Sequence, residues 1–293
     1  MASPSRVPRT SRAAPAPRSS RPAAQPAPFE PRACFSLRAL SSRRARVPAG
    51  AAFTALAALL VLAPAPAARA DRRSFIRAYE YATQPEGNLE LEIWNDLAIP
   101  RGNAAGIVAT PRVELEVGLT DHWDMALYHV FESKLDGDKQ GFSLDSWRLE
   151  TRYRLLEKGE LPIDVMFYLE AERPADFRAP WELEEKIILA KDLGRLGLVT
   201  NLVAEQKLAS GDSAGHKFEI DVGARWEFVP ALRVGVEYFV TIESAPGQAL
   251  ETRHYLGPSV SLATGKVWLQ LGAGFGLGDN EQVFARAALG FNL

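Results

Sequence analysis

The sequence is poor in the residues that build disulfides and histidine-based sites. It contains one cysteine, Cys34, and four histidines among 293 residues. One cysteine cannot form an intramolecular disulfide, and four histidines leave little material for a histidine-based catalytic or metal site. The longest apolar run, residues 51–63, falls short of the roughly 20 residues that a membrane-spanning helix needs. These absences exclude a disulfide scaffold and a helical membrane protein.

The apolar run instead belongs to an export signal. Arg43, Arg44 and Arg46 precede it, and Ala68-Arg69-Ala70 follows it. A basic flank, a short apolar stretch and a small-x-small site in this order predict a secretory signal peptide. We expect cleavage before Asp71, so that residues 1–70 form a removed leader. Its basic part is longer than usual, which indicates either a start codon assigned too early or an organelle transit peptide; the complete signal peptide downstream favours the first.

Removing the leader makes the chain acidic. Residues 1–70 carry 11 of the 34 Lys and Arg and one of the 36 Asp and Glu, so the remainder holds 23 basic and 35 acidic residues, a formal net charge of −12. Nucleic-acid phosphates need Lys and Arg to neutralise them. We therefore expect no nucleic-acid partner. Because Cys34 lies in the leader, the mature chain has no thiol.

From about residue 88 onward the pattern has a period of two. The even positions from Phe218 to Phe228 are apolar, and the odd positions from Lys217 to Glu227 are mostly charged. Such alternation puts one set of side chains on each face of a β-strand. Most runs have about ten residues, the length of a tilted transmembrane strand. We expect twelve strands, near 88–96, 112–119, 123–132, 143–155, 163–172, 183–191, 196–207, 216–228, 232–241, 252–262, 267–277 and 282–293.

The connections alternate in length. Short links are expected at 120–122, 156–162, 192–195, 229–231 and 263–266, and longer ones at 97–111, 133–142, 173–182, 208–215 and 242–251. Short periplasmic turns alternating with longer outer loops are typical of even-stranded outer-membrane barrels. The sequence therefore predicts an all-β, antiparallel, up-and-down transmembrane barrel over residues 88–293. Residues 71–87 are expected to form a periplasmic N-terminal arm, for which the lumen is a second possible place.

Alternation alone does not tell a membrane barrel from a soluble sandwich, which also separates apolar and polar faces. Aromatic residues at strand ends favour the membrane, because aromatic girdles lie at bilayer interfaces. We assign Tyr153, Trp226, Phe228 and Phe291 to the periplasmic rim, and Trp94, Phe131 and Tyr238 to the other rim. The chain also ends on a strand. We expect location in the bacterial outer membrane, with its lipids as partners.

Three segments resemble known outer-membrane proteins. The last strand, residues 283–293, resembles their C-terminal assembly signal, with Arg286, Ala288, Phe291 and Leu293 at its four marked positions; Ala288 replaces the usual Gly, and Leu293 the terminal aromatic residue. The segments Glu116–Trp123 and Tyr255–Leu262 are similar to Gram-negative transporter-like barrels of the type linked to meta-pathway phenol degradation. The resemblance implies that the barrel-assembly machinery binds residues 283–293 and that the barrel transports solutes.

The polar set of the alternation is expected to face the barrel interior. Its charges have both signs, which fits either a wet pore for polar solutes or a closed ladder of salt bridges that fills a narrow barrel. The acidic excess would favour cations mildly. The predicted lumen-lining residues are Glu114, Glu116, Arg148, Glu150, Arg152, Glu170, Glu219, Asp221, Arg225, Arg233, Glu237, Arg253 and Arg286.

The sequence gives weak support for a catalytic or metal-binding site. The one Gly-x-Ser-x-Gly sequence, at residues 211–215, falls in an expected loop between two strands. A nucleophile elbow instead needs a strand-to-helix turn, and His122, His129, His216 and His254 show no spacing that pairs a histidine base with a serine nucleophile. The loop Asp136–Gly141 has alternate acids but lacks the closing Glu of a calcium loop. We expect no catalytic, cofactor or metal site.

The leading hypothesis is thus a passive pore or transporter for small solutes. The alternatives are a structural or surface-interaction barrel with a blocked lumen and, less favoured, an outer-membrane hydrolase. One further pattern fits any of these. Gly272, Gly274 and Gly276 alternate along one strand, where they leave room inside the barrel or permit bending beside Trp268.

Overall fold

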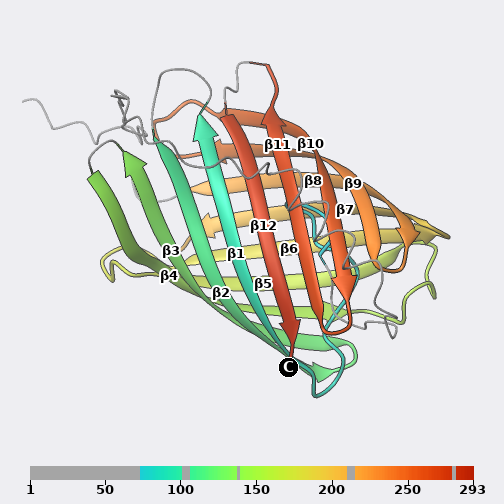
Figure 1. The fold of residues 1–293 in the computed structure, drawn as a ribbon. Helices are drawn as coiled ribbons and strands as arrows, with labels where there is room; N and C mark the ends of the chain where they lie inside the picture. The colour runs from blue at the N-terminus through green and yellow to red at the C-terminus, as the bar shows by residue number, and fades with distance from the viewer. Residues whose placement is uncertain (1–72, 101–105, 137–138, 210–214, 279–281) are drawn as a thin grey trace, which may run out of the picture. The chain divides into compact units, whose positions relative to one another are not determined.

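The computed structural model describes residues 73–100, 106–136, 139–209, 215–278 and 282–293, all of which belong to one compact unit. The predicted leader and its cleavage site lie outside the described residues. Twelve strands form a closed antiparallel barrel (Figure 1). The strands are β1 Leu89–Pro100, β2 Ile107–Thr120, β3 Trp123–Asp136, β4 Lys139–Arg154, β5 Asp164–Pro174, β6 Glu182–Leu193, β7 Leu196–Lys207, β8 His216–Val229, β9 Leu232–Ser244, β10 Glu251–Thr264, β11 Val267–Gly276 and β12 Gln282–Asn292.

Strand order and closure follow the chain. Each strand pairs with its sequence neighbours, and β1 closes the ring by pairing with β12, where Leu91 faces Phe291. Closure leaves no strand edge unpaired. Among the described residues, no helix is long and apolar enough to cross a membrane. The predicted all-β, twelve-stranded, antiparallel barrel is confirmed.

The two ends of the barrel differ. The turns at residues 121–122, 194–195, 230–231 and 265–266 lie at one end, here called the turn end, and the opposite end is called the loop end. Two expected long links were wrong: most of residues 97–111 and 133–142 extend β1 to β4. These segments break the strict apolar–polar alternation, but backbone pairing continues through most of their residues. The acidic side chains of Asp136 and Asp138, considered for calcium, lie outside the described residues.

The outer face of the barrel is apolar. Mid-strand side chains on neighbouring strands point outward and are exposed, among them Leu115 (45%), Leu127 (46%) and Leu149 (49%), which face one another across the β2, β3 and β4 pairings. Large contiguous apolar surfaces are rare on soluble proteins. This face is the lipid-facing band of an outer-membrane barrel.

The inner face carries the charged set together with large aromatic and aliphatic side chains. Trp94, Tyr128 and Trp268 are at most 3% exposed and point inward. The assignment of Trp94 to an aromatic girdle was therefore wrong. Its position in β1 has the same parity as those of Glu92 and Asp96, so the alternation directs it inward.

Candidate functional site

The described N-terminal arm, residues 73–84, runs through the barrel interior (Figure 1). Phe75, Ile76 and Ala78 are at most 5% exposed although the arm belongs to no strand. The arm joins β1 at the turn end, where the amide of Gly87 donates a hydrogen bond to the Gly118 carbonyl (3.0 Å). Gly87 has φ of 76°, a left-handed conformation that glycine adopts without steric cost.

Inward-facing side chains of the wall bind the arm's backbone. The Glu237 carboxylate on β9 accepts hydrogen bonds from the consecutive amides of Ile76 (2.6 Å), Arg77 (2.9 Å) and Ala78 (2.5 Å). Asn201 on β7 accepts from the Tyr79 amide (2.6 Å) and donates to its carbonyl (3.1 Å). Four backbone donors and one acceptor are thus satisfied inside the barrel, as buried polar groups require.

Three inward glycines leave space for the arm's apolar side chains. A Cβ atom added at Gly223 would lie 2.6 Å from the Phe75 ring, and one at Gly235 would lie 3.2 Å from it. A Cβ atom at Gly272 would lie 2.5 Å from Cγ1 of Ile76. The wall of β8, β9 and β11 is therefore shaped to the side chains of the arm.

A second set of contacts holds the arm near the turn end. The Thr83 hydroxyl donates to the Asp121 carbonyl (2.7 Å), and the Gln84 amide donates to the Asp124 carboxylate (2.8 Å). The Tyr81 hydroxyl donates to the Leu156 carbonyl (2.6 Å). Deeper in the lumen, the Tyr79 hydroxyl donates to the Glu150 carboxylate (3.3 Å).

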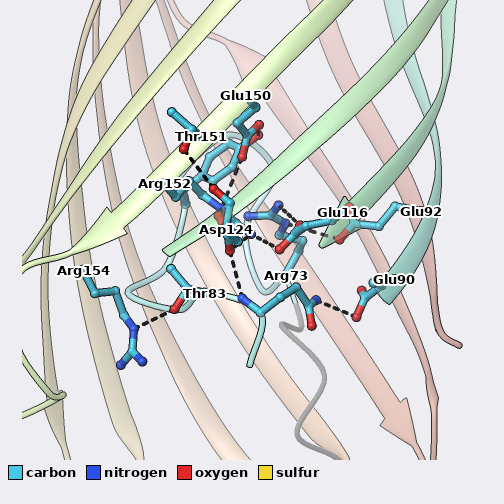
Figure 2. A network of polar contacts seen from close by, with 12 residues as sticks. Arg73, Thr83, Glu90, Glu92, Glu116, Asp124, Glu150, Thr151, Arg152 and Arg154 are labelled. Carbon is cyan, nitrogen blue, oxygen red and sulfur yellow. Dashed lines mark hydrogen bonds and ion pairs between the residues drawn. The ribbon is translucent and has the colours of Figure 1, made fainter. Parts of the chain in front are cut away.

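The wall of β2 to β4 carries a buried network of ion pairs (Figure 2). The Arg152 guanidinium donates to the Asp124 carboxylate (3.0 and 2.7 Å) and to Glu116, and Nε lies 3.3 Å from Glu150. These four side chains are at most 1% exposed. Arg73 of the arm joins the network, 3.6 Å from Glu116. Wall and arm thus share one electrostatic network.

Three carboxylates on β1 and β2, those of Glu92, Glu114 and Glu116, bring oxygen atoms within 4.8 Å of one another. Such a group could hold a metal ion by donor type. The guanidinium of Arg73 lies 3.9 Å from Glu92 and 3.6 Å from Glu116, so a cationic side chain already supplies positive charge here. We assign no metal to the cluster.

Most of the predicted lumen residues lie inside the barrel. Arg148 and Arg233 are each 23% exposed. Arg253 is 35% exposed and pairs with Glu243 and Glu251 towards the loop end, apart from the others. Ten are at most 6% exposed: Glu114, Glu116, Glu150, Arg152, Glu170, Glu219, Asp221, Arg225, Glu237 and Arg286.

The structure forms three groups from these residues. Glu114, Glu116, Glu150 and Arg152 meet on β2 to β4, and Arg148 pairs with Glu170 between β4 and β5 (3.1 Å). The third group consists of Glu219, Asp221 and Glu237 on β8 and β9. Arg225 and Arg233 instead reach Glu80 of the arm, and Arg286 reaches Asp96 and the Ile76 carbonyl.

Sequence reasoning missed the contacts of the arm and two inward wall residues. Asn201 binds the backbone of Tyr79, and Asp96 pairs with Arg112 and Arg286. Residues 73–84 have no period that places them against any strand. The glycines at inward positions of the alternation did indicate that the wall leaves space inside the barrel. Gly272 and Gly274 were expected to leave room inside the barrel, and Gly272 contacts Ile76 while Gly274 lies against Phe239.

Comparison with known proteins supports the fold. No family model and no curated protein matches the sequence. The COG4313 outer membrane channel from Pseudomonas putida F1 is similar in structure, with 13% identity, a TM-score of 0.55, and coverage of 75% of this chain and all of that one. The NanC porin is also similar, with 8% identity, a TM-score of 0.52, and coverage of 69% of this chain and all of that one. At these identities the likeness concerns the fold alone, a closed antiparallel β-barrel.

Proposed function

We propose that the protein is a passive outer-membrane channel for small solutes and that its N-terminal arm closes it. One observation carries this proposal: a separate segment of the chain, rather than wall side chains meeting across the barrel, occupies the space beside β8, β9 and β11. Noncovalent contacts hold the segment there, so it can leave while every strand pairing remains.

The chemistry of the wall supports passage of polar solutes. The inner face carries carboxylates and guanidinium groups close together, such as Arg148 with Glu170 and Arg286 with Asp96. Such a wall replaces the hydration of a polar solute as it moves. Acids exceed bases in residues 71–293, which favours cations.

Two of the four histidines contact groups other than a serine. The His122 ring contacts the Glu157 carboxylate (2.9 Å), and the His254 ring is hydrogen-bonded to the Tyr238 hydroxyl (2.7 Å). A nucleophilic serine needs a histidine base within hydrogen-bond reach, and these two rings are engaged elsewhere. The two similar structures are a channel and a porin.

The test is the conductance of the refolded protein in planar bilayers, with and without the variant Gly223→Val/Gly272→Val. A Cβ atom added at these positions lies closest to Phe75 and to Ile76 respectively, so we expect the valine side chains to displace the arm. We expect a small intermittent current from the native chain and a larger, steadier one from the variant.

The matched control is Gly141→Val, because a Cβ atom at Gly141 meets nothing within 4 Å. Its current should equal that of the native chain. Correctly folded barrels that carry no current in either form would support the blocked structural barrel instead.

A further inference from the structure

The arm's Arg77 occupies a site that the barrel wall builds completely. The Glu219 carboxylate on β8 accepts two hydrogen bonds from one guanidinium, from Nε (2.8 Å) and from Nη2 (2.6 Å) of Arg77. Such two-point pairing matches the planar fork of a guanidinium, which a lysine ammonium cannot reproduce. Glu219 is 3% exposed and Arg77 is 25% exposed, so the carboxylate is buried while the guanidinium remains partly accessible from the lumen.

The groups beside Glu219 bind the backbone next to the guanidinium. Glu237 faces the amides of residues 76–78, and Asn201 pairs with both backbone groups of Tyr79. The Arg286 guanidinium donates to the Ile76 carbonyl. Together they form a receptor for an arginine and the bent backbone around it.

The wall's own charges favour a cation at this place. Glu219, Asp221 and Glu237 are inward neighbours on β8 and β9, each at most 3% exposed. Among the described residues, Arg77 is the ion-pair partner of Glu219. Buried carboxylates without a paired cation are costly, so departure of Arg77 leaves a site that attracts another cation of the same shape.

We propose that this wall of β7, β8 and β9 is a binding site for solutes that carry a guanidinium group, such as arginine and short arginine-containing peptides, and that Arg77 occupies it as an internal competitor. The proposal rests on the proposed channel function, because a solute reaches the site through the lumen. It identifies the solute class by chemistry: the guanidinium binds Glu219, and adjacent N–H or ammonium groups bind Glu237.

The test is chemical rescue in the full chain. Arg77→Ala removes the guanidinium and leaves its space beside Glu219. We expect a lower thermal midpoint than in the native protein, followed by heat-dependent gel migration or tryptophan fluorescence. Methylguanidinium at millimolar concentration should raise that midpoint by about 2–4 °C, since a ligand that binds only the folded state stabilises it.

Three comparisons make the result specific. N-methylurea has a similar shape without the charge and should have no effect. Methylguanidinium should have no effect on Arg77→Ala/Glu219→Gln, but it should still act on Arg77→Ala/Glu172→Gln, because Glu172 pairs with Arg148 on β4 (2.8 Å). Equal shifts with and without Glu219, or no shift in any variant, would overturn the proposed site.

Failure of the channel function would be visible separately. If methylguanidinium rescues Arg77→Ala through Glu219 while no form of the protein conducts, the site stands and the channel function falls. If the protein conducts but rescue fails, the channel stands and the guanidinium site falls.

Discussion

The two sides of the lumen are built in opposite ways. On β1 to β4, the wall fills its own space with large side chains such as Trp94 and Tyr128 and with the Arg152 network. On β8, β9 and β11, glycines open the wall, and Phe75 and Ile76 of the arm fill the space. The arm adds Arg73 to a network that the first side builds from its own side chains, whereas the second side is a seat for the arm's apolar side chains.

The largest expected effect concerns the self-filled side. Arg152→Met leaves the buried carboxylates of Glu116, Asp124 and Glu150 without their shared cation, and breaking a buried ion pair costs about 3–5 kcal/mol. We expect the thermal midpoint of the barrel to fall by about 10 °C. Lys134→Met, which removes an exposed pair with Glu132, should change the midpoint little. Equal midpoints for both variants would show that the network does not stabilise the wall.

The next effect concerns the seat. Gly223→Val should displace the arm through a clash with Phe75 and raise the conductance, while the strand pairings remain. Phe75→Ala/Gly223→Val removes the clash, so its conductance should lie below that of Gly223→Val alone. This non-additivity, measured in a double-mutant cycle, distinguishes a steric seat from two independent effects. Additive changes would contradict the fit between Phe75 and Gly223.

The smallest effect concerns the backbone contacts. Asn201→Ala removes two hydrogen bonds to Tyr79, each worth about 0.5–1.5 kcal/mol. We expect the fraction of time spent conducting to rise by roughly tenfold, as read from single-channel records. Thr200→Ala changes the adjacent, outward position and is the control. A tenfold change in the Thr200→Ala control as well would show that the effect does not come from the hydrogen bonds between Asn201 and Tyr79.

The barrel could be predicted from the sequence because the pattern that indicates each strand lies within the residues of that strand. The alternation of apolar and polar residues within each strand, as in residues 217–228, determines which side chains face lipid. Trp94 has the same parity as the inward residues Glu92 and Asp96, so the alternation also predicts that it faces the lumen. The ends of β2 to β4 escaped prediction because pairing continues through residues without apolar alternation.

The arm's place could not be predicted, because its contacts join residues far apart in the sequence. Ile76 meets Glu237 across 161 positions, and Arg286 reaches Ile76 across 210. These pairs exist only once the ring has closed. Inward glycines such as Gly223 indicate that other side chains occupy the lumen beside them, but they do not identify the segment that provides those side chains.

The central claim is that the arm closes the channel, and a reversible lock tests it most directly. The Ser259 hydroxyl lies 2.7 Å from the Ser74 carbonyl oxygen, and residues 71–293 contain no cysteine, so Ser74→Cys/Ser259→Cys offers one disulfide between arm and wall. Mass spectrometry verifies the disulfide. We expect the locked protein to carry almost no current and reduction to raise the current severalfold. The current of each single variant should be the same with and without the reductant. Equal currents before and after reduction would contradict closure by the arm.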